Sequence, residues 1–318
     1  MKTADPGVRK DSRRPRFPHR QTTLVGCAHV TALLLLTGVC LAPGLSRAAD
    51  ERVAIERGQY LVHAGGCLTC HTADRPDAIP LAGGRALETP FGTYYTPNLT
   101  PDAATGLGAW TKADIGRALR DGVAPDGSYY YPVFPYPAYT GLSDSDVAAI
   151  AAFLRNLKPV RQVIPDHEIP WYLSNRVVMW GWNLLNFTPG RYAPDASRNA
   201  AWNRGAYLVR HLGHCGECHT PRNALGGLDR TQELAGNPGG PDGEKIPDIT
   251  QDKTSGIGNW SEDEIVLFLE YGVLPDGDFA GSSMSDVISD NTAKLTTEDR
   301  LAIAAYLKAL DAPDRPRP

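Results

Sequence analysis

Two five-residue segments, residues 67–71 (Cys-Leu-Thr-Cys-His) and 215–219 (Cys-Gly-Glu-Cys-His), constrain this chain more than any other feature. Two cysteines three positions apart on the first turn of a helix can form thioethers with both vinyl groups of one porphyrin, and the histidine that follows then points at the iron. The spacing therefore predicts two covalently bound haem c groups. The expected thioether partners are Cys67, Cys70, Cys215 and Cys218, and the expected proximal iron ligands are His71 and His219.

Zinc sites and dithiol redox centres also use Cys-x-x-Cys pairs, but both fit this sequence less well than haem. A zinc site split between the pairs does not need a histidine directly after each pair, and the pairs lie far apart in the sequence. A thioredoxin-like dithiol belongs in a βαβ pattern, which the sequence around the motifs lacks. With six Cys and eight His in 318 residues, one such motif would arise by chance roughly 0.003 times per chain, so two copies favour haem.

Residues 1–48 have the composition of a targeting segment. Basic residues come first, an apolar run is densest from Val30 to Leu41, and residues 46–48 (Ser-Arg-Ala) supply small side chains where a signal peptidase cleaves. We therefore expect a signal peptide at 1–48 and a mature chain that starts near Ala49 in the periplasm. The apolar run is short for a helix that spans a bilayer, and the alternative of an uncleaved leader that anchors the chain stays open.

Removal of this leader would leave an acidic chain. Eight of the 32 basic and two of the 36 acidic residues lie in residues 1–48, so 24 basic and 34 acidic residues remain, a formal charge of −10. This balance argues against nucleic acid or an anionic membrane surface as a partner. The acidic surface is either a means of solubility or a face for a basic redox partner.

The rest of the chain is an internal repeat with two copies. The matching segments are 57–62 with 204–209 (Arg-Gly-x-Tyr-Leu-Val), 106–110 with 256–260 (Gly-Leu/Ile-Gly-x-Trp), and 122–127 with 272–277 (Gly-Val-x-Pro-Asp-Gly). The last two pairs share an offset of 150 residues. Two copies are too few for a solenoid, and they predict two like domains, the first copy at 49–160 and the second copy at 201–312.

Each copy carries the same series of helix signals. A first helix leads into the Cys-x-x-Cys-His motif, and its glycine, Gly58 or Gly205, predicts close packing against another helix, because glycine costs about 1 kcal/mol relative to alanine in a helix. Two later helices begin with Ser or Thr followed three residues on by an acid, which is a capping signature. These starts are Thr111, Ser143, Ser261 and Thr296. No segment alternates convincingly as a strand, so we predict an all-α fold of two tandem domains.

Residues 161–200, here called the strap, join the two copies. A solvated tether would not carry the aromatic side chains found there, which are Trp171, Tyr172, Trp180, Trp182 and Phe187. We expect an ordered linker with a short helix near residues 176–187 that packs on one or both domains. The Pro-rich tail at 313–318 is expected to fray.

A six-coordinate haem also needs a distal iron ligand, and Met is the usual one in cytochromes c. Met284 lies between the last two helices of the second copy, where a distal loop belongs, so we expect it to ligate the second iron. The residue 150 positions earlier is Phe134, which cannot bind iron. The candidates for the first iron are Met179, His167, a tyrosine (Tyr130, Tyr131, Tyr136 or Tyr139) or no sixth ligand at all; Met179 and the open site rank first.

Several repeated residues have less certain roles. The indole N–H of Trp110 and Trp260 can reach a haem propionate, or the rings simply pack in the core. His63 and His211 each precede a motif by four residues and are expected to be surface or capping groups. His214, next to Cys215, is expected to line the edge of the second haem.

The paired motifs, the Gly-x-Gly-x-Trp repeats, residues 131–137 (Tyr-Pro-Val-Phe-Pro-Tyr-Pro) and residues 179–185 (Met-Trp-Gly-Trp-Asn-Leu-Leu) resemble the periplasmic cytochrome c subunits of bacterial alcohol, gluconate and aldehyde dehydrogenases. The resemblance covers nearly the whole mature chain. It implies two tandem class I cytochrome c-like domains. In the alcohol dehydrogenase cytochromes the segment carries Met where this chain has Phe134, which puts the ligation of the first haem in doubt.

The resemblance implies that the chain takes electrons from a periplasmic dehydrogenase and passes them to quinone, a terminal oxidase or another cytochrome. The chain shows no dinucleotide fingerprint, phosphate loop or nucleophile–base motif, so we assign it no catalytic residue and expect an electron-transfer subunit. Membrane association would then come from a partner or an uncleaved leader. The alternative is a dihaem redox enzyme, peroxidase-like or thiosulfate-oxidising, that uses an open or unusually ligated first haem.

Overall fold

The computed structural model describes residues 43–240 and 243–311. Most of the expected leader and the whole of the expected tail lie outside the described residues. The first copy contains α1 (Pro43–Ala64), α2 (Cys67–His71), β1 (Ala86–Thr89), β2 (Gly92–Tyr95), α3 (Lys112–Asp121), α4 (Tyr136–Tyr139) and α5 (Asp144–Asn156). The strap contains α6 (Trp171–Ser174) and α7 (Val177–Asn186). The second copy contains α8 (Ala200–Tyr207), a π-helical turn η1 (Leu208–Leu212), α9 (Gly216–His219), the 3-10 turn η2 (Arg230–Gln232), α10 (Glu262–Tyr271), α11 (Ser282–Asp290), the 3-10 turn η4 (Thr292–Lys294) and α12 (Thr297–Lys308).

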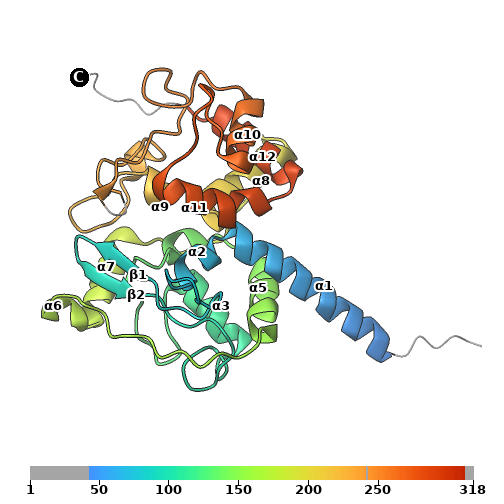
Figure 1. Ribbon diagram of the computed structural model, residues 1–318, viewed down its shortest axis with the longest axis vertical. Coiled ribbons are helices and arrows are strands. Elements are labelled where there is room, and N and C mark those ends of the chain that lie inside the picture. Colours follow the sequence, from blue (N-terminus) through green and yellow to red (C-terminus); the bar gives the residue numbers. More distant parts are fainter. Residues whose placement is uncertain (1–42, 241–242, 312–318) are drawn as a thin grey trace, which may run out of the picture. The chain divides into compact units, whose positions relative to one another are not determined.

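The first and last helices of each copy pack against each other: α1 lies along α5, and α8 lies along α12 (Figure 1). The repeated glycines make this close approach possible. A Cβ atom at Gly58 would lie 2.0 Å from the carbonyl oxygen of Ala149, and one at Gly205 would lie 1.9 Å from that of Ala302. The sequence-based prediction of close helix packing at both glycines is therefore confirmed.

The predicted helix starts are also confirmed. Thr111 and Ser261 each form a complete capping box, in which the side chain accepts from the backbone N–H three residues on and the acid there returns to the cap. Ser143 and Thr296 cap α5 and α12 in the same way. Asp146 and Asp299, the acids that follow these two caps, do not accept from the cap backbone. Each accepts instead from a tyrosine of the other copy.

A two-stranded antiparallel sheet corrects the expectation that the chain has no strands. β1 and β2 pair with Ala86 opposite Tyr95 and Thr89 opposite Gly92. Each strand is four residues long, which is too short for an alternating pattern to be recognised in the sequence.

The strap packs mainly through one side of α7. Met179 and Asn183 are buried, and the hydroxyl of fully buried Tyr136 donates to Asn183 Oδ1 at 2.5 Å. Other large side chains of the strap are not packed: Trp171 of α6 and Trp180 of α7 are 85% and 52% exposed. The expected helix near 176–187 is therefore confirmed, but several of the aromatic side chains that suggested packing lie on the surface.

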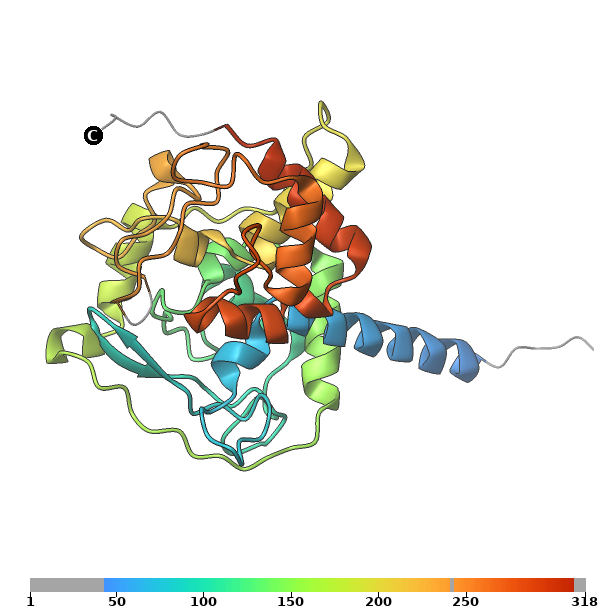
Figure 2. The ribbon, with the colours of Figure 1, turned by 45° about the horizontal axis from the view of Figure 1, so that its top comes forward.

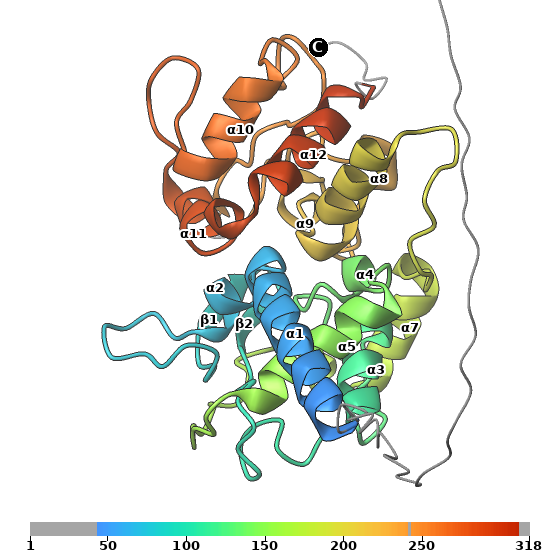
Figure 3. The same ribbon diagram turned by 90° about the vertical axis from the view of Figure 1, so that its right-hand side faces the viewer.

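The two copies lie within one compact unit, in which α8 and α12 of the second copy face α1 and α5 of the first (Figure 3). A reciprocal pair of hydrogen bonds joins the copies. Tyr60 of α1 donates to Asp299 of α12 at 2.5 Å, and Tyr207 of α8 donates to Asp146 of α5 at 2.6 Å. Each tyrosine belongs to the repeated Arg-Gly-x-Tyr segment. At this interface the repeated tyrosine of each copy therefore donates to the aspartate near the start of the last helix of the other copy.

The two histidines four residues before the motifs, His63 and His211, also bond across the interface, each to a backbone carbonyl of the other copy. The Nδ1 of His63 bonds to the carbonyl of Asp290, and the Nδ1 of His211 bonds to that of Ala138. They are therefore half-buried groups of the interface between the copies and not free surface groups. Figure 2 shows that the N-terminal turns of α1 extend beyond the helices on which it packs. Within the described residues, no helix has both the length and the hydropathy needed to cross a bilayer.

Candidate haem sites

Both Cys-x-x-Cys-His motifs form a short helical turn at the end of the first helix of their copy. In α2 and α9 the cysteines are half-buried and unpaired. Burial, with a smaller effect of the neighbouring thiol, raises the pKa of Cys67 to about 12 and that of Cys215 to about 12. Neutral thiols of this kind do not suit a dithiol oxidoreductase, which needs a thiolate with a lowered pKa.

The motif histidines are held in the state that a metal ligand requires. Nδ1 of His71 lies 2.9 Å from the carbonyl oxygen of Pro97, and Nδ1 of His219 lies 2.8 Å from that of Pro247. A carbonyl can only accept, so Nδ1 carries the proton and the lone pair lies on Nε2. Burial lowers the pKa of both histidines, which favours the neutral ring. The four thiols and two oriented imidazoles fit covalently bound haem c.

The segments that supply the two carbonyls are also copies of one another. The side-chain oxygens of Asn98 and Asp248 accept from the backbone N–H of Thr100 and Thr250, at 2.9 and 2.7 Å. All four side chains are buried, as is expected of a turn whose polar groups are paired internally.

The Gly-x-Gly-x-Trp repeats have their physical role at these turns. A Cβ atom at Gly106 would lie 2.1 Å from the carbonyl oxygen of Thr100, and one at Gly256 would lie 2.5 Å from that of Thr250. The repeated glycines therefore allow the chain to pack directly on the turn that orients each motif histidine.

Sequence reasoning missed these turns. The signal was present, because residues 97–100 (Pro-Asn-Leu-Thr) and 247–250 (Pro-Asp-Ile-Thr) match at the same offset of 150 residues as the Gly-x-Gly-x-Trp and Gly-Val-x-Pro-Asp-Gly repeats.

The chain also leaves the two motifs along the same path. The N–H of Gly83 donates to the carbonyl of His71, and the N–H of Gly236 donates to that of His219, both at 2.8 Å. Leu81 and Leu234 each have a φ of 63°, a left-handed conformation that is strained for a branched side chain. The same unfavourable backbone at both sites indicates a strict spatial requirement behind each motif.

The two motifs approach each other across the interface between the copies. Tyr139 of the first copy donates to the carbonyl of Gly65 at 2.7 Å and lies edge-on to His214, with ring centroids 5.4 Å apart. His214 contacts the carbonyl of Gly65 through Nε2 at 3.2 Å. Gly65 and His214 precede the first cysteine of their motifs by two residues and by one, so these contacts connect the two attachment sites. His214, which precedes the second motif, therefore also contacts the segment before the first.

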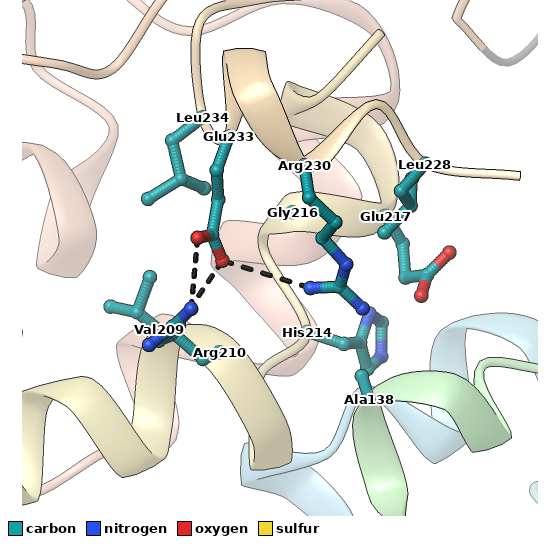
Figure 4. A pocket seen from close by; sticks show the side chains of 10 residues that line it. All are labelled: Ala138, Val209, Arg210, His214, Gly216, Glu217, Leu228, Arg230, Glu233 and Leu234. Atoms are coloured by element: carbon teal, nitrogen blue, oxygen red, sulfur yellow. Dashed lines mark hydrogen bonds and ion pairs between the residues drawn. The ribbon is translucent and has the colours of Figure 1, made fainter. Parts of the chain in front are cut away.

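A small cavity lies behind the second motif (Figure 4). Figure 4 shows Arg210 and Arg230 reaching Glu233, while His214 and Glu217 line the other side. The cavity holds about one water molecule, so it is part of the support of the motif and is not a substrate site.

The structure separates the candidates for the distal ligands. Met284 lies in the first turn of α11 and is half-buried. Phe134, its counterpart in the first copy, packs edge-on against Tyr130 and Tyr139 at centroid distances of 5.5 and 5.9 Å. Met179 is 5% exposed and lies in a cluster with Tyr94 and Tyr131.

The other candidates for the first iron are engaged elsewhere. His167 accepts from the N–H of Tyr95 through Nδ1 at 3.2 Å, and its ring lies against Tyr131. Tyrosine binds iron as a phenolate, and burial raises the pKa of Tyr130 to about 12 and holds that of Tyr139 well above its ordinary value. These shifts disfavour a tyrosine ligand at neutral pH.

The repeated tryptophans lie against the core of each copy. Both are half-buried, and the carbonyl of Trp110 accepts from Arg155 while that of Trp260 accepts from Lys308. In the described part of the chain neither indole N–H donates a hydrogen bond to protein, so both are available to another acceptor. The described residues contain no group of three or more His, Cys, Asp or Glu side chains placed to hold a metal ion, so the motif cysteines do not come together as a zinc site.

Comparisons with known proteins agree with this geometry. The cytochrome c family model matches residues 55–158. A diheme cytochrome c-type protein of Cereibacter sphaeroides is 45% identical over 80% of this chain and 86% of its own length. The gluconate 2-dehydrogenase cytochrome c subunit of Pantoea cypripedii is 38% identical, and the fructose dehydrogenase cytochrome subunit of Gluconobacter japonicus is 37% identical, each over 89% of this chain. The chain spans 65% and 58% of the length of these two subunits. It belongs to the cytochrome c family and is a relative of the cytochrome subunits of dehydrogenases.

Proposed function

We propose that this protein is a periplasmic two-haem electron-transfer subunit, which accepts electrons from a dehydrogenase and passes them to quinone, a terminal oxidase or another cytochrome. The observation that carries the proposal is the twofold occurrence of one site: two thiols and an imidazole whose Nδ1 is bound to a proline carbonyl, at His71 and again at His219. The names of the relatives, which are cytochrome subunits of dehydrogenases, support the donor.

We also propose that the two copies are tandem class I cytochrome c-like domains, at 49–160 and 201–312, joined by the ordered strap at 161–200. The recurrent packing of the first helix on the last supports this division, since α1 with α5 and α8 with α12 form equivalent pairs. Each copy then supplies the attachment site and the surrounding apolar core for one haem.

The bound haem supplies the one-electron redox change, and the protein residues hold and tune it. The cysteines fix each porphyrin covalently, and the hydrogen bond from Nδ1 to the proline carbonyl sets the orientation of the imidazole and raises its basicity as a ligand. Trp110 and Trp260 are proposed to donate to haem propionates. Electron transfer by a haem requires no proton donor or nucleophile from the protein, and none is assigned to these sites.

For the distal ligands we propose Met284 at the second haem and Met179 at the first. Met284 belongs to a half-buried helical turn in the second copy. Met179 is the buried methionine on α7, which packs against Tyr131 in the same segment as Phe134. A thioether raises the potential of the haem that it ligates. Because a methionine opposite the histidine makes the iron six-coordinate, two such ligands would give two low-spin haems.

The proposal is tested first by counting the haems. Intact mass and a pyridine haemochrome assay on the purified protein should both give two covalent porphyrins per chain, and Cys215→Ala with Cys218→Ala should leave one. A wild-type protein with one porphyrin would contradict the proposal. The N-terminal sequence of the exported protein should begin near Ala49.

The axial ligands are tested by substitution in this two-haem protein. Met284→Ala and Met179→Ala should each remove about half of the methionine–iron charge-transfer absorption and convert one haem to high spin in electron paramagnetic resonance. Phe134→Leu, at the position that lacks a ligand, should change neither signal. A wild-type protein that already contains a high-spin haem, and whose spectrum changes with peroxide or cyanide, would instead support the dihaem redox enzyme, because Phe134 leaves the first iron without the repeated methionine.

A further inference from the structure

The two copies differ sharply on one surface, which is the outer face of α10 and the hairpin that follows it. Leu267, Tyr271 and Phe279 are 44%, 61% and 64% exposed. The residues at the same places in the first copy, 150 positions earlier, are Arg117, Asp121 and Tyr129. At these three places the second copy exposes large apolar side chains where the first copy has two charged residues and a half-buried tyrosine, which points to a role that the first copy does not have there.

These three side chains come from adjacent pieces of backbone. Leu267 and Tyr271 are four residues apart on α10, so they lie on one face of the helix. The N–H of Ala280 donates to the carbonyl of Gly272 at 2.8 Å, which brings the residue after Phe279 beside the residue after Tyr271. We call this surface, made by Leu267, Tyr271 and Phe279, the α10 face.

The strap covers the corresponding hairpin in the first copy. Arg176 donates to the carbonyl of Tyr129 at 2.8 Å, and the hydroxyl of Tyr131 donates to the carbonyl of Leu173 at 2.8 Å. No described residue plays this role over Phe279. The hairpin is therefore exposed in the second copy and covered by the strap in the first, whereas the outer faces of α3 and α10 are exposed in both copies.

Acidic side chains surround the α10 face. Glu262, Asp263, Asp276 and Asp278 are exposed, and none of them forms an ion pair within the described residues. The first copy has Lys112, Ala113, Asp126 and Ser128 at these places. One exposed lysine, Lys294, lies on the turn that packs against α10, so the rim is strongly but not uniformly negative.

We propose that the α10 face is the docking surface for a basic redox protein that presents an apolar centre ringed by Lys or Arg. An apolar centre with a charged rim of one sign is how an interface combines burial with electrostatic steering of the encounter. Phe279 of this face is five residues before Met284, which lies in the first turn of α11 directly after the hairpin, so docking there brings a partner to the proposed ligand of the second haem. This inference rests on the proposed electron-transfer function and names where one of its partners binds.

The test uses the purified two-haem protein and a charge-neutral exchange between the copies. Leu267→Arg with Tyr271→Asp gives α10 the residues of the first copy without changing the net charge. The probe is a basic single-haem c-type cytochrome, and stopped-flow absorption measures its second-order rate of electron exchange. We expect the double substitution on α10 to lower this rate about tenfold or more at low salt. The wild-type rate should fall steeply as ionic strength increases.

The matched control makes the reverse change on the first copy. Arg117→Leu with Asp121→Tyr should leave the rate unaltered, and both variants should be oxidised by ferricyanide at the wild-type rate if their haems are intact. An equal loss in both variants, an unchanged rate in the α10 variant, or a rate independent of salt would overturn the docking proposal and leave the haem count untouched. Loss of binding to vesicles of phosphatidylcholine and phosphatidylglycerol in the α10 variant alone would overturn it in favour of a lipid-binding face.

Discussion

The reciprocal Tyr–Asp hydrogen bonds between the copies predict an unequal pair of effects. Tyr207→Phe removes the donor to Asp146, and Tyr60→Phe removes the donor to Asp299. The two substitutions are chemically identical and lie at matching positions of the repeat. The remaining partners of the two carboxylates differ, so the cost of the two substitutions should differ as well.

The magnitude follows from these remaining partners. Asp299 keeps two bonds from Arg204, at 2.7 and 2.6 Å, one to each oxygen. Asp146 keeps a single contact from Arg57, at 3.1 Å to Oδ1, and its Oδ2 loses its side-chain donor in a residue that is only 6% exposed. A buried charged acceptor left without its partner costs about 1.5–3 kcal/mol, whereas a hydrogen bond that leaves its acceptor satisfied is worth about 1 kcal/mol.

We therefore expect Tyr207→Phe to lower the free energy of unfolding by about 2–3 kcal/mol and Tyr60→Phe by about 1 kcal/mol. Urea unfolding of the purified protein, followed by circular dichroism and haem absorption, measures both losses. Tyr172→Phe, which removes an exposed hydroxyl on the strap, is the control and should have no effect. Equal losses for the two interface variants, or a larger loss for Tyr60→Phe, would refute the reasoning.

The hydrogen bond between Tyr60 and Asp299 also predicts how stability depends on pH. Burial raises the pKa of Asp299, but the hydrogen bonds from Arg204 and Tyr60 outweigh it, and the net pKa is lowered. A carboxyl group whose pKa is lower in the folded protein stabilises it above the ordinary carboxyl pKa, and this stabilisation is lost as the pH falls through the lowered pKa. Tyr60→Phe removes one of the lowering bonds, so its acid unfolding should begin at a higher pH than that of the wild type.

Three further predictions each follow from a single contact. Gly58→Ala places a methyl group 2.0 Å from a carbonyl oxygen of α5 and should destabilise the protein by about 1–3 kcal/mol or more, whereas Gly181→Ala, with nothing within 4 Å in helix α7, should be neutral or slightly stabilising in thermal unfolding. Asn98→Ala removes the buried acceptor of the turn behind the first motif histidine, so electron paramagnetic resonance should show a changed first haem beside an unchanged second one. Tyr136→Phe leaves the oxygen of Asn183 without its donor, and limited proteolysis should cut the strap faster than in the wild type.

Much of the local structure could be predicted because its causes lie within a few residues. Thr111 and Ser261 begin their helices with capping boxes that are complete within four positions. Gly58 and Gly205 predicted close helix packing, since a glycine in a helix interior is costly unless something needs the space. The short hairpin was missed because four residues show too little alternation.

The candidate sites divide in the same way. The thiols and the motif histidines could be identified from spacing alone, but the carbonyls that orient those histidines lie 26 and 28 residues further along the chain. The short helix of the strap could be predicted, yet Trp171 is 85% exposed, because an aromatic side chain in the sequence does not say which side of its helix faces the core.

The sequence by itself determined the covalent chemistry of the chain, the starts of its helices and the fact that one unit occurs twice, since each of these depends on neighbouring residues. Only the tertiary structure decided how the two units use the same residues differently. Asp146 and Asp299 follow capping residues as Asp114 does, but they bond to a tyrosine of the other copy, and only the packing of the two copies brings those tyrosines within reach. Likewise the hairpins that follow α3 and α10 are equivalent, and the strap contacts the first of them but, within the described residues, not the second, which leaves Phe279 exposed.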